Sequence, residues 1–312
     1  MLRIYLFGRP RIYQEPNPDE IKLTRVTQSL LAYLLLFRHR THPRDILSAV
    51  FWGDQPQEKA RNCLNTAIWR LRSSLELNGA SSNPYILSTQ AGEVGFNLTS
   101  PFWLDVEVFD HQVGAALATP QTEPVTLEQY LALYSGDLLE SYYDDWAIRE
   151  REYQRQLYLR GLSLLMETSF SLGDYAKSLE FGGKILAQDP LREEVHRHLM
   201  RTYVASGQRT LAARQYEICR AILAAELGIE PMEETKTLYE SLIGTSRLPA
   251  GSSSPRGKTH RKSTVGPAMH SNGQVELDEA LAQLEQVRLA FDEARARLLL
   301  AMARVERLAQ DE

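Results

Sequence analysis

The spacing of apolar residues changes twice within residues 1–100, and no other feature restricts the fold as strongly. Strand-like stretches come first, at residues 2–7, 11–13 and 21–23. Helical spacing follows in three segments, one capped by Thr27, one opened by Pro43 and one over residues 57–77. Two further strand-like stretches, 85–89 and 94–98, flank a turn and predict a hairpin. This order predicts an α+β winged helix-turn-helix domain over residues 1–100.

The predicted third helix, 57–77, has two chemically different faces. Four apolar side chains share one narrow arc at about 100° per residue and predict the core face; they are Leu64, Ile68, Leu71 and Leu75. The rest of the helix is polar and cationic. Amides and guanidinium groups can contact purine edges in the major groove, and cations can neutralise phosphates. An ordinary solvated face is the alternative, although an exposed Trp69 fits it poorly.

The candidate DNA contacts therefore fall into three sets. The base-facing set is Asn62, Asn65, Thr66, Trp69 and Arg70. The phosphate-facing set is Lys59, Arg61 and Arg72, and the hairpin adds Thr89 and Gln90.

Charge is distributed unevenly along the chain. The formal net charge is −5, which argues against a histone-like coat for nucleic acid. Residues 1–100 nevertheless carry a net +4, residues 101–244 a net −10 and residues 245–274 a net +5. A basic first domain before an acidic body favours contact of the first part with a polyanion, although chance fluctuation alone could produce a difference of this kind.

Several classes of protein are disfavoured by the sequence. Cys63 and Cys219 lie far apart without CxxC spacing, which argues against a disulfide framework or a cysteine zinc site and favours a reducing compartment. The longest nearly apolar run, 30–37, is too short to span a bilayer, and the first residues do not resemble a signal peptide. We therefore expect a soluble cytoplasmic protein.

No enzyme or cofactor motif is present. Phosphate-binding loops, dinucleotide-binding glycines, HExxH and GxSxG are all missing, so we expect neither enzymatic activity nor a cofactor. His196 and His198 are two residues apart, which places them on different sides of a helix and argues against a shared metal. We expect both to be partly exposed. Asp144 and Asp145 are expected in a solvated acidic loop.

Residues 104–244 are helical in pattern and contain an internal repeat. Gly173 and Gly207 lie 34 residues apart, and at the same offset Leu165 matches Leu199. A 34-residue helix–turn–helix unit predicts an all-α, tetratricopeptide-like domain, and such domains usually bind proteins. Unrelated amphipathic helices that share this spacing by chance are the alternative.

The last part of the chain divides in two. Residues 245–274 are rich in Ser, Gly, Pro and cations and predict a flexible basic linker. Within residues 275–312, apolar residues occupy ten successive a and d positions of one heptad frame, which predicts a C-terminal helix with a coiled-coil seam. We expect a homodimer through residues 275–310, with docking on the body or on a partner as the alternatives.

The order of these features resembles a known family over about three quarters of the chain. The matching motifs are Leu2-Arg3-Ile4, Phe51-Trp52-Gly53-Asp54, Trp69-Arg70-Leu71-Arg72, Asp145-Trp146, Asp189-Pro190-Leu191-Arg192-Glu193 and Leu223-Ala224-Ala225-Glu226-Leu227-Gly228-Ile229-Glu230-Pro231. They are similar to motifs of the antibiotic regulatory proteins, which join an OmpR-type winged helix to a bacterial transcriptional activator domain.

The resemblance implies a bacterial, nucleoid-associated transcription regulator, usually an activator. Such a protein would bind repeats in double-stranded DNA near promoters through helix 57–77, and its loop 52–57 would help recruit RNA polymerase. Two departures affect the DNA contacts: the wing turn is Ala91-Gly92-Glu93, and Trp69 stands where relatives commonly have a small or basic residue. The alternative function is a protein-binding scaffold whose winged helix no longer reads DNA.

Overall fold

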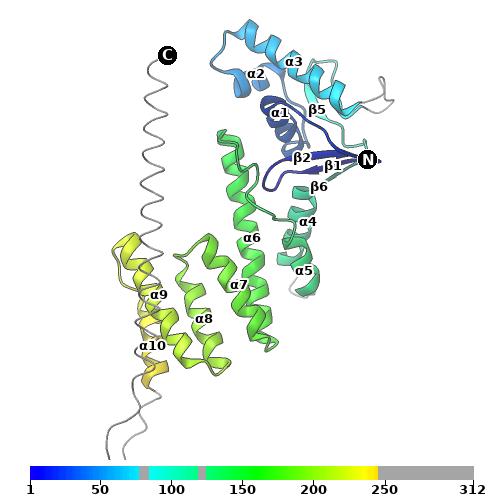
Figure 1. Cartoon of the computed structure of the whole chain (residues 1–312). Coiled ribbons are helices and arrows are strands. Elements are labelled where there is room, and N and C mark those ends of the chain that lie inside the picture. Colours follow the sequence, from blue (N-terminus) through cyan, green and yellow to red (C-terminus); the bar gives the residue numbers. More distant parts are fainter. Residues whose placement is uncertain (77–83, 119–123, 245–312) are drawn as a thin grey trace, which may run out of the picture. The chain divides into compact units, whose positions relative to one another are not determined.

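The structure is a computed structural model that describes residues 1–76, 84–118 and 124–244 (Figure 1). The predicted linker, 245–274, and the predicted heptad helix, 275–312, lie outside the described residues. The strands are β1 (Leu2–Tyr5), β2 (Arg11–Gln14), β3 (Asn17–Glu20), β4 (Ile86–Ser88), β5 (Val94–Phe96) and β6 (Phe102–Leu104). The helices are α1 (Arg25–Leu36), α2 (Arg44–Trp52), α3 (Gln57–Leu75), α4 (Asp105–Ala118), α5 (Pro124–Leu131), α6 (Asp145–Ser171), α7 (Tyr175–Gln188), α8 (Glu193–Ala205), α9 (Arg209–Leu227) and α10 (Glu233–Gly244).

The N-terminal part is an α+β winged-helix-like region. A four-stranded sheet has the order β3-β2-β1-β6, and β4 and β5 form a separate antiparallel hairpin in the register Ile86↔Phe96 and Ser88↔Val94. The predicted hairpin is therefore confirmed. Strand β6 was not predicted; it pairs parallel with β1 and adds residues just beyond the hairpin to the first sheet.

The third strand lies earlier than the sequence pattern predicts. We expected it at residues 21–23, but β3 covers Asn17–Glu20 and pairs antiparallel with β2. The expectation followed the apolar residues, whereas an edge strand of a sheet tolerates proline and acidic residues. Ile21 keeps one ladder contact, since its N–H donates to the Ile12 carbonyl at 2.8 Å.

Helices α1 and α2 both pack against α3, which turns its predicted apolar face to the core. The four core residues of α3, Leu64, Ile68, Leu71 and Leu75, are at most 3% exposed. Helix α1 begins at Arg25, so its N-cap is Thr24 and the predicted cap, Thr27, is wrong by three residues. Thr27 is instead buried, and its hydroxyl lies 2.8 Å from that of Thr24.

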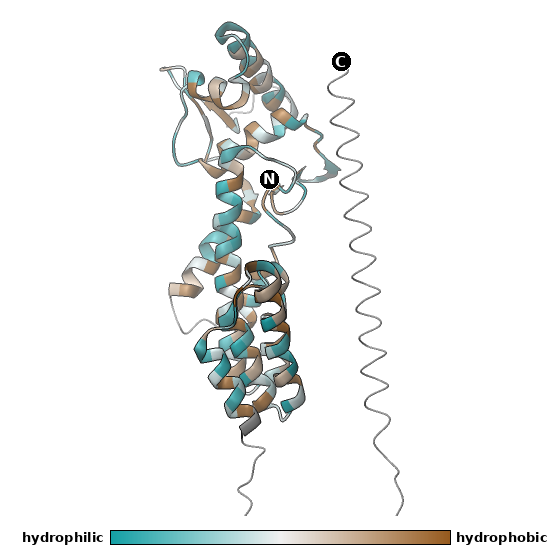
Figure 2. Cartoon of the chain, turned by 90° about the vertical axis from the view of Figure 1, so that its left-hand side faces the viewer, coloured by the Kyte–Doolittle hydropathy of each residue, from teal (hydrophilic) through white to brown (hydrophobic). Residues whose placement is uncertain are grey.

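The C-terminal part is helical from α4 to α10 (Figure 1). Helix α6 is longer than expected, and after its first turn it carries a strongly hydrophilic stretch, residues 149–156, coloured teal in Figure 2. Two helix ends 34 residues apart have the same geometry. Gly173 and Gly207 have φ values of +79° and +81°, and their N–H groups donate to the Phe170 and Val204 carbonyls at 3.0 and 2.9 Å. Glycine adopts this left-handed conformation without the steric cost of a Cβ.

One hydrophobic core cluster extends from β1 to the start of α8 and joins the two parts, and a second cluster, Met200, Ala212 and Tyr216, lies in α8 and α9. The ring centroid of Phe7 lies 5.1 Å from that of Phe109 in α4 and 5.0 Å from that of Tyr134. The Trp146 ring of α6 lies 5.3 Å from Tyr33 of α1. None of the helices within the described residues combines the length and apolar composition needed to cross a membrane.

A buried carboxylate reinforces this junction. Asp105 is 2% exposed, and its oxygens accept the backbone N–H groups of Leu6 at 2.9 Å and Phe7 at 3.0 Å. It therefore fixes the start of α4 to the end of β1 across 99 residues of sequence.

Candidate nucleic-acid interface

Helix α3 carries the predicted base-facing residues on an exposed surface. The base-facing residues are all exposed, and Trp69 is 67% exposed; they are Asn62, Asn65, Thr66, Trp69 and Arg70. Lys59 and Arg61 are also exposed, whereas Arg72 is half-buried. The helical period alone therefore separated the core face from the exposed face correctly.

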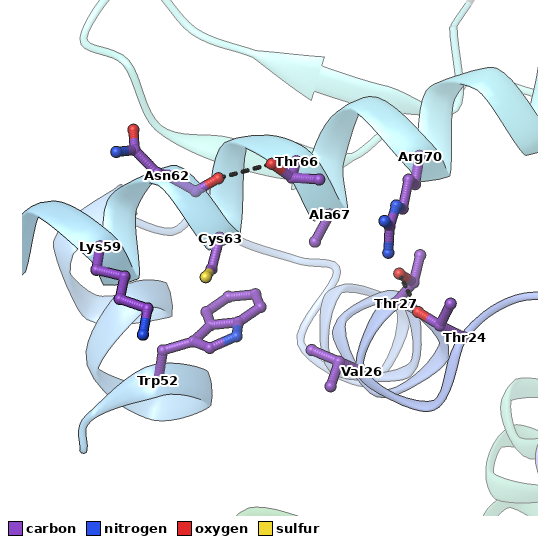
Figure 3. Close-up of a pocket in the computed structure, with 10 residues that line it drawn as sticks. All are labelled: Thr24, Val26, Thr27, Trp52, Lys59, Asn62, Cys63, Thr66, Ala67 and Arg70. Atoms are coloured by element: carbon purple, nitrogen blue, oxygen red, sulfur yellow. Dashed lines mark hydrogen bonds between the residues drawn. The ribbon is translucent and has the colours of Figure 1, made fainter. Parts of the chain in front are cut away.

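One side of this face borders an open pocket of about 520 Å³ between α3, α1 and the end of α2 (Figure 3). Lys59 reaches toward Trp52, and Arg70 reaches toward Thr24 and Thr27, while the Asn62 amide points away from the pocket. Within the described residues, the side chains of Lys59, Asn62 and Arg70 have no hydrogen bond or ion pair. They are available to an external partner.

The opposite side of the face is tied to the rest of the domain. Arg61 pairs with Asp45 at 2.9 Å, and both side chains are more than half exposed. Arg72 donates to the Ile86 carbonyl at 3.2 Å and to Ser88 Oγ at 2.8 Å, which joins α3 to β4. Two of the three predicted phosphate contacts thus have partners inside the protein.

Arg44, at the start of α2, links three elements and was not predicted. Its guanidinium donates to the Gly92 carbonyl at 2.9 Å, to Asn65 Oδ1 at 2.7 Å and to Ser88 Oγ at 3.3 Å. A cation in the first turn of a helix is disfavoured by the helix dipole. The position of Arg44 was therefore a signal in the sequence that its side chain makes contacts outside α2.

The contact with Arg44 also determines how Asn65 can act. A guanidinium group has only donors, so Asn65 must turn its carbonyl oxygen toward Arg44. Its amide nitrogen is then left to donate to another partner. Asn65 can therefore present a donor to a base edge, whereas the amide of Asn62 can present both a donor and an acceptor.

The hairpin turn is organised by its own residues. Thr89 Oγ1 accepts the Glu93 N–H at 3.1 Å, and the Thr89 N–H donates to the Glu93 carbonyl at 2.9 Å. The Glu93 carboxylate accepts a hydrogen bond from the Thr41 hydroxyl. Thr89 and Gln90 are exposed at the turn. The Glu93 carboxylate of the wing thus has a hydrogen-bond partner within the domain.

The expectation that His196 and His198 are partly exposed is wrong for His196 and confirmed for His198. His196 is 1% exposed, with Nε2 at 3.0 Å from the Pro190 carbonyl and Nδ1 at 2.7 Å from Gln215 Nε2. His198 is half-buried, with Nε2 at 3.1 Å from Ser178 Oγ. Burial lowers the pKa of both imidazoles. The described residues contain no cluster of three or more His, Cys, Asp or Glu side chains placed to hold a metal ion.

Comparison with known proteins agrees with this two-part architecture. A family model described as "Transcriptional regulatory protein, C terminal" matches residues 18–94, and one described as "Bacterial transcriptional activator domain" matches residues 104–243. The chain belongs to the family of transcriptional regulators that join these two domains.

Two kinds of relative illustrate the family. Regulatory protein AfsR of Streptomyces griseus is 28% identical over 223 residues, which are 69% of this chain and 22% of AfsR. Transcriptional regulatory protein MoaR1 of Mycobacterium bovis is 24% identical over 228 residues, 69% of this chain and 71% of MoaR1. The chain thus spans less than a quarter of the AfsR length.

A solved structure supports the fold. EmbR of Mycobacterium tuberculosis, determined in complex with a low-affinity phosphopeptide, matches with a TM-score of 0.62 and 20% identity. The match covers 80% of this chain and 66% of the EmbR chain. At this identity the likeness concerns the arrangement of elements alone.

Proposed function

We infer that this regulator binds double-stranded DNA sequence-specifically through α3 and the β4–β5 wing and activates transcription. The observation that carries this proposal is the exposed face of α3, where amide, hydroxyl and cationic side chains stand uncovered beside the wing. Such groups match base edges and phosphates, and the recognition helix of a winged helix lies in the major groove.

The residues divide by the partners they already have. Asn62, Asn65, Thr66, Trp69 and Arg70 face the bases. Lys59 is the uncovered cation for phosphates, and Thr89 and Gln90 extend the contact at the wing. Arg61 and Arg72 can reach phosphates only by sharing or exchanging their internal partners, because both are engaged in the free protein.

The remaining parts of the proposal come from the sequence. Residues 1–100 form the DNA-binding unit, and residues 104–244 form a tetratricopeptide-like unit that binds a protein. Loop 52–57 contacts RNA polymerase in the bacterial cytoplasm. Self-association through residues 275–310 is predicted from the heptads alone, and sedimentation of the full chain at micromolar concentration as a monomer would contradict it.

The test is selection of the full-length protein against a randomised duplex library at two salt concentrations. We expect one enriched motif, repeated at a fixed spacing, and an affinity whose logarithm falls with log salt by about 0.9 per phosphate neutralised. Arg70→Ala should cost roughly 1–3 kcal/mol and relax preference at one position of the motif.

A matched control is Arg160→Ala, which removes an exposed cation from the helical part. This variant should bind the motif like the wild type. If the wild type enriches no motif and shows only weak, salt-sensitive binding to DNA of any sequence, the DNA-reading proposal is wrong. A protein-binding scaffold is then the better account.

A further inference from the structure

Trp69 stands apart from the other tryptophans of the chain. Trp52, Trp103 and Trp146 each pack against another ring, with centroids between 5.1 and 6.4 Å apart. Trp69 has no ring or cation contact within the described residues and is 67% exposed. Exposing a large indole to water is unfavourable, and this one lies at the centre of the polar face of α3.

We propose that Trp69 reads the C5-methyl group of thymine in the major groove. This inference rests on the proposed DNA binding and names what part of the site recognises. An apolar surface is the chemical complement of a thymine methyl, which cytosine lacks and which protrudes into the major groove.

The position of Trp69 on α3 supports this assignment. Trp69 follows Asn62 by seven residues, or two helical turns, and it follows Asn65 and Thr66 by four and three. Helical side chains lean toward the N-terminus, so the indole lies over the turn that carries Asn65 and Thr66. The helix therefore presents an apolar plate within a group of hydrogen-bonding side chains.

This combination fits an A·T pair. The amide of Asn62, which has no partner inside the protein, can donate to N7 and accept from N6 of adenine, while the thymine partner of an A·T pair offers a methyl group. Phosphate binding would make poor use of an indole, which is uncharged and has a single donor. Stacking on bases is unavailable inside an intact duplex, where base edges alone face the groove.

The experiment replaces thymine by uracil, one position at a time, in the motif obtained from the library selection. The substitution removes the methyl group and leaves every hydrogen-bonding atom in place. We expect the affinity of the wild type to fall about fourfold at one or two positions, the effect of losing one buried methyl group. Trp69→Ala should bind the thymine and uracil duplexes equally at those positions.

Two controls make the result specific. Ser73→Ala changes another exposed residue of α3 and should keep the full sensitivity to uracil. Trp69→Ala should unfold at the same urea concentration as the wild type, because the side chain touches little of the protein. A further arm replaces the uracil-sensitive thymine by cytosine or by 5-methylcytosine, each paired with guanine, and the wild type should bind the 5-methylcytosine duplex more tightly because it returns the methyl group. Equal binding of these two duplexes by the wild type would contradict methyl reading by Trp69.

The outcomes separate this inference from the function on which it rests. Motif binding that is equal for thymine and uracil at every position would overturn the role of Trp69 and leave DNA reading intact. Failure to select any motif would overturn both. If Trp69→Ala keeps the full uracil effect, the methyl is read by another residue and Trp69 is free for a protein partner.

Discussion

At the scale of single residues, the interface depends on which polar groups are already satisfied. The cations expected to contact DNA differ in their surroundings, since Arg72 and Arg61 are bound to Ser88 and Asp45. Lys59 and Arg70 are unpaired within the described part of the chain. Arg44 is the residue that organises the rest, because one guanidinium connects α2, α3 and the wing.

Arg44→Ala should weaken both stability and DNA reading. The half-buried guanidinium donates three hydrogen bonds, so its loss should lower the free energy of unfolding by roughly 1–2 kcal/mol, measured by urea titration. Arg44→Lys should not restore the loss, because an ammonium group cannot reproduce the planar fork. Arg61→Ala is the control, since an exposed ion pair contributes little, about 0–1 kcal/mol. Equal unfolding midpoints for Arg44→Ala and Arg61→Ala would contradict this role.

At the scale of elements, helix packing distinguishes two neighbouring glycines in α7. A Cβ on Gly182 would lie 2.5 Å from Leu199 Cδ2 and 3.2 Å from Met166 Sδ. A Cβ on Gly183 would meet no atom within 4 Å. Gly182 is therefore required where α7 packs against α6 and α8, and Gly183 is not.

The two alanine variants should thus change stability in opposite directions. Gly182→Ala should destabilise the helical part by roughly 1–3 kcal/mol because the buried Leu199 side chain must move. Gly183→Ala should stabilise it by up to about 1 kcal/mol through helix propensity. Thermal unfolding followed by circular dichroism measures both, and a rise in melting temperature for Gly182→Ala would show that α7 does not pack this closely.

At the scale of the whole molecule, Asp105 joins the sheet of the winged-helix-like region to the first helix of the helical part. Burial raises the pKa of Asp105 from 3.8 to about 6, although three backbone N–H groups oppose the shift. A raised pKa means that the folded protein binds the proton more tightly than the unfolded chain does. The contribution of Asp105 to stability is therefore largest below about pH 4 and declines until about pH 6.

Asp105→Asn should remove this pH dependence and reduce stability. An asparagine NH₂ group in place of Oδ2 would face the N–H donors of both Leu6 and Phe7, which should cost roughly 1–3 kcal/mol. The measurement is the difference in unfolding free energy between wild type and variant from pH 4 to pH 8. Taking the difference matters because His196 and His198, with lowered pKa values, change stability in the opposite direction over part of this range. A difference independent of pH would rule out titration of Asp105.

Features that depend on local periodicity follow from the amino-acid sequence alone. Spacings of two, three and four residues predict the two faces of α3, the β4–β5 hairpin and the helical character of residues 104–244. Each of these spacings is a property of a single helix or strand. Family membership was also visible in the order of short motifs. These features could be predicted because each depends on residues close together in the chain.

Features that join distant segments depend on how the chain packs in three dimensions. Strand β6 exists because β1 offers it an edge 100 residues away, and His196 is buried because α9 brings Gln215 against it. The pairing of Arg44 with Asn65 and Ser88 likewise spans 21 and 44 residues. The side chains of Arg44, Arg70 and Arg72 are chemically identical, so which of them remains uncovered depends on where the fold places an acceptor. That placement is a property of the packed domain, and it selects the residues left available to DNA.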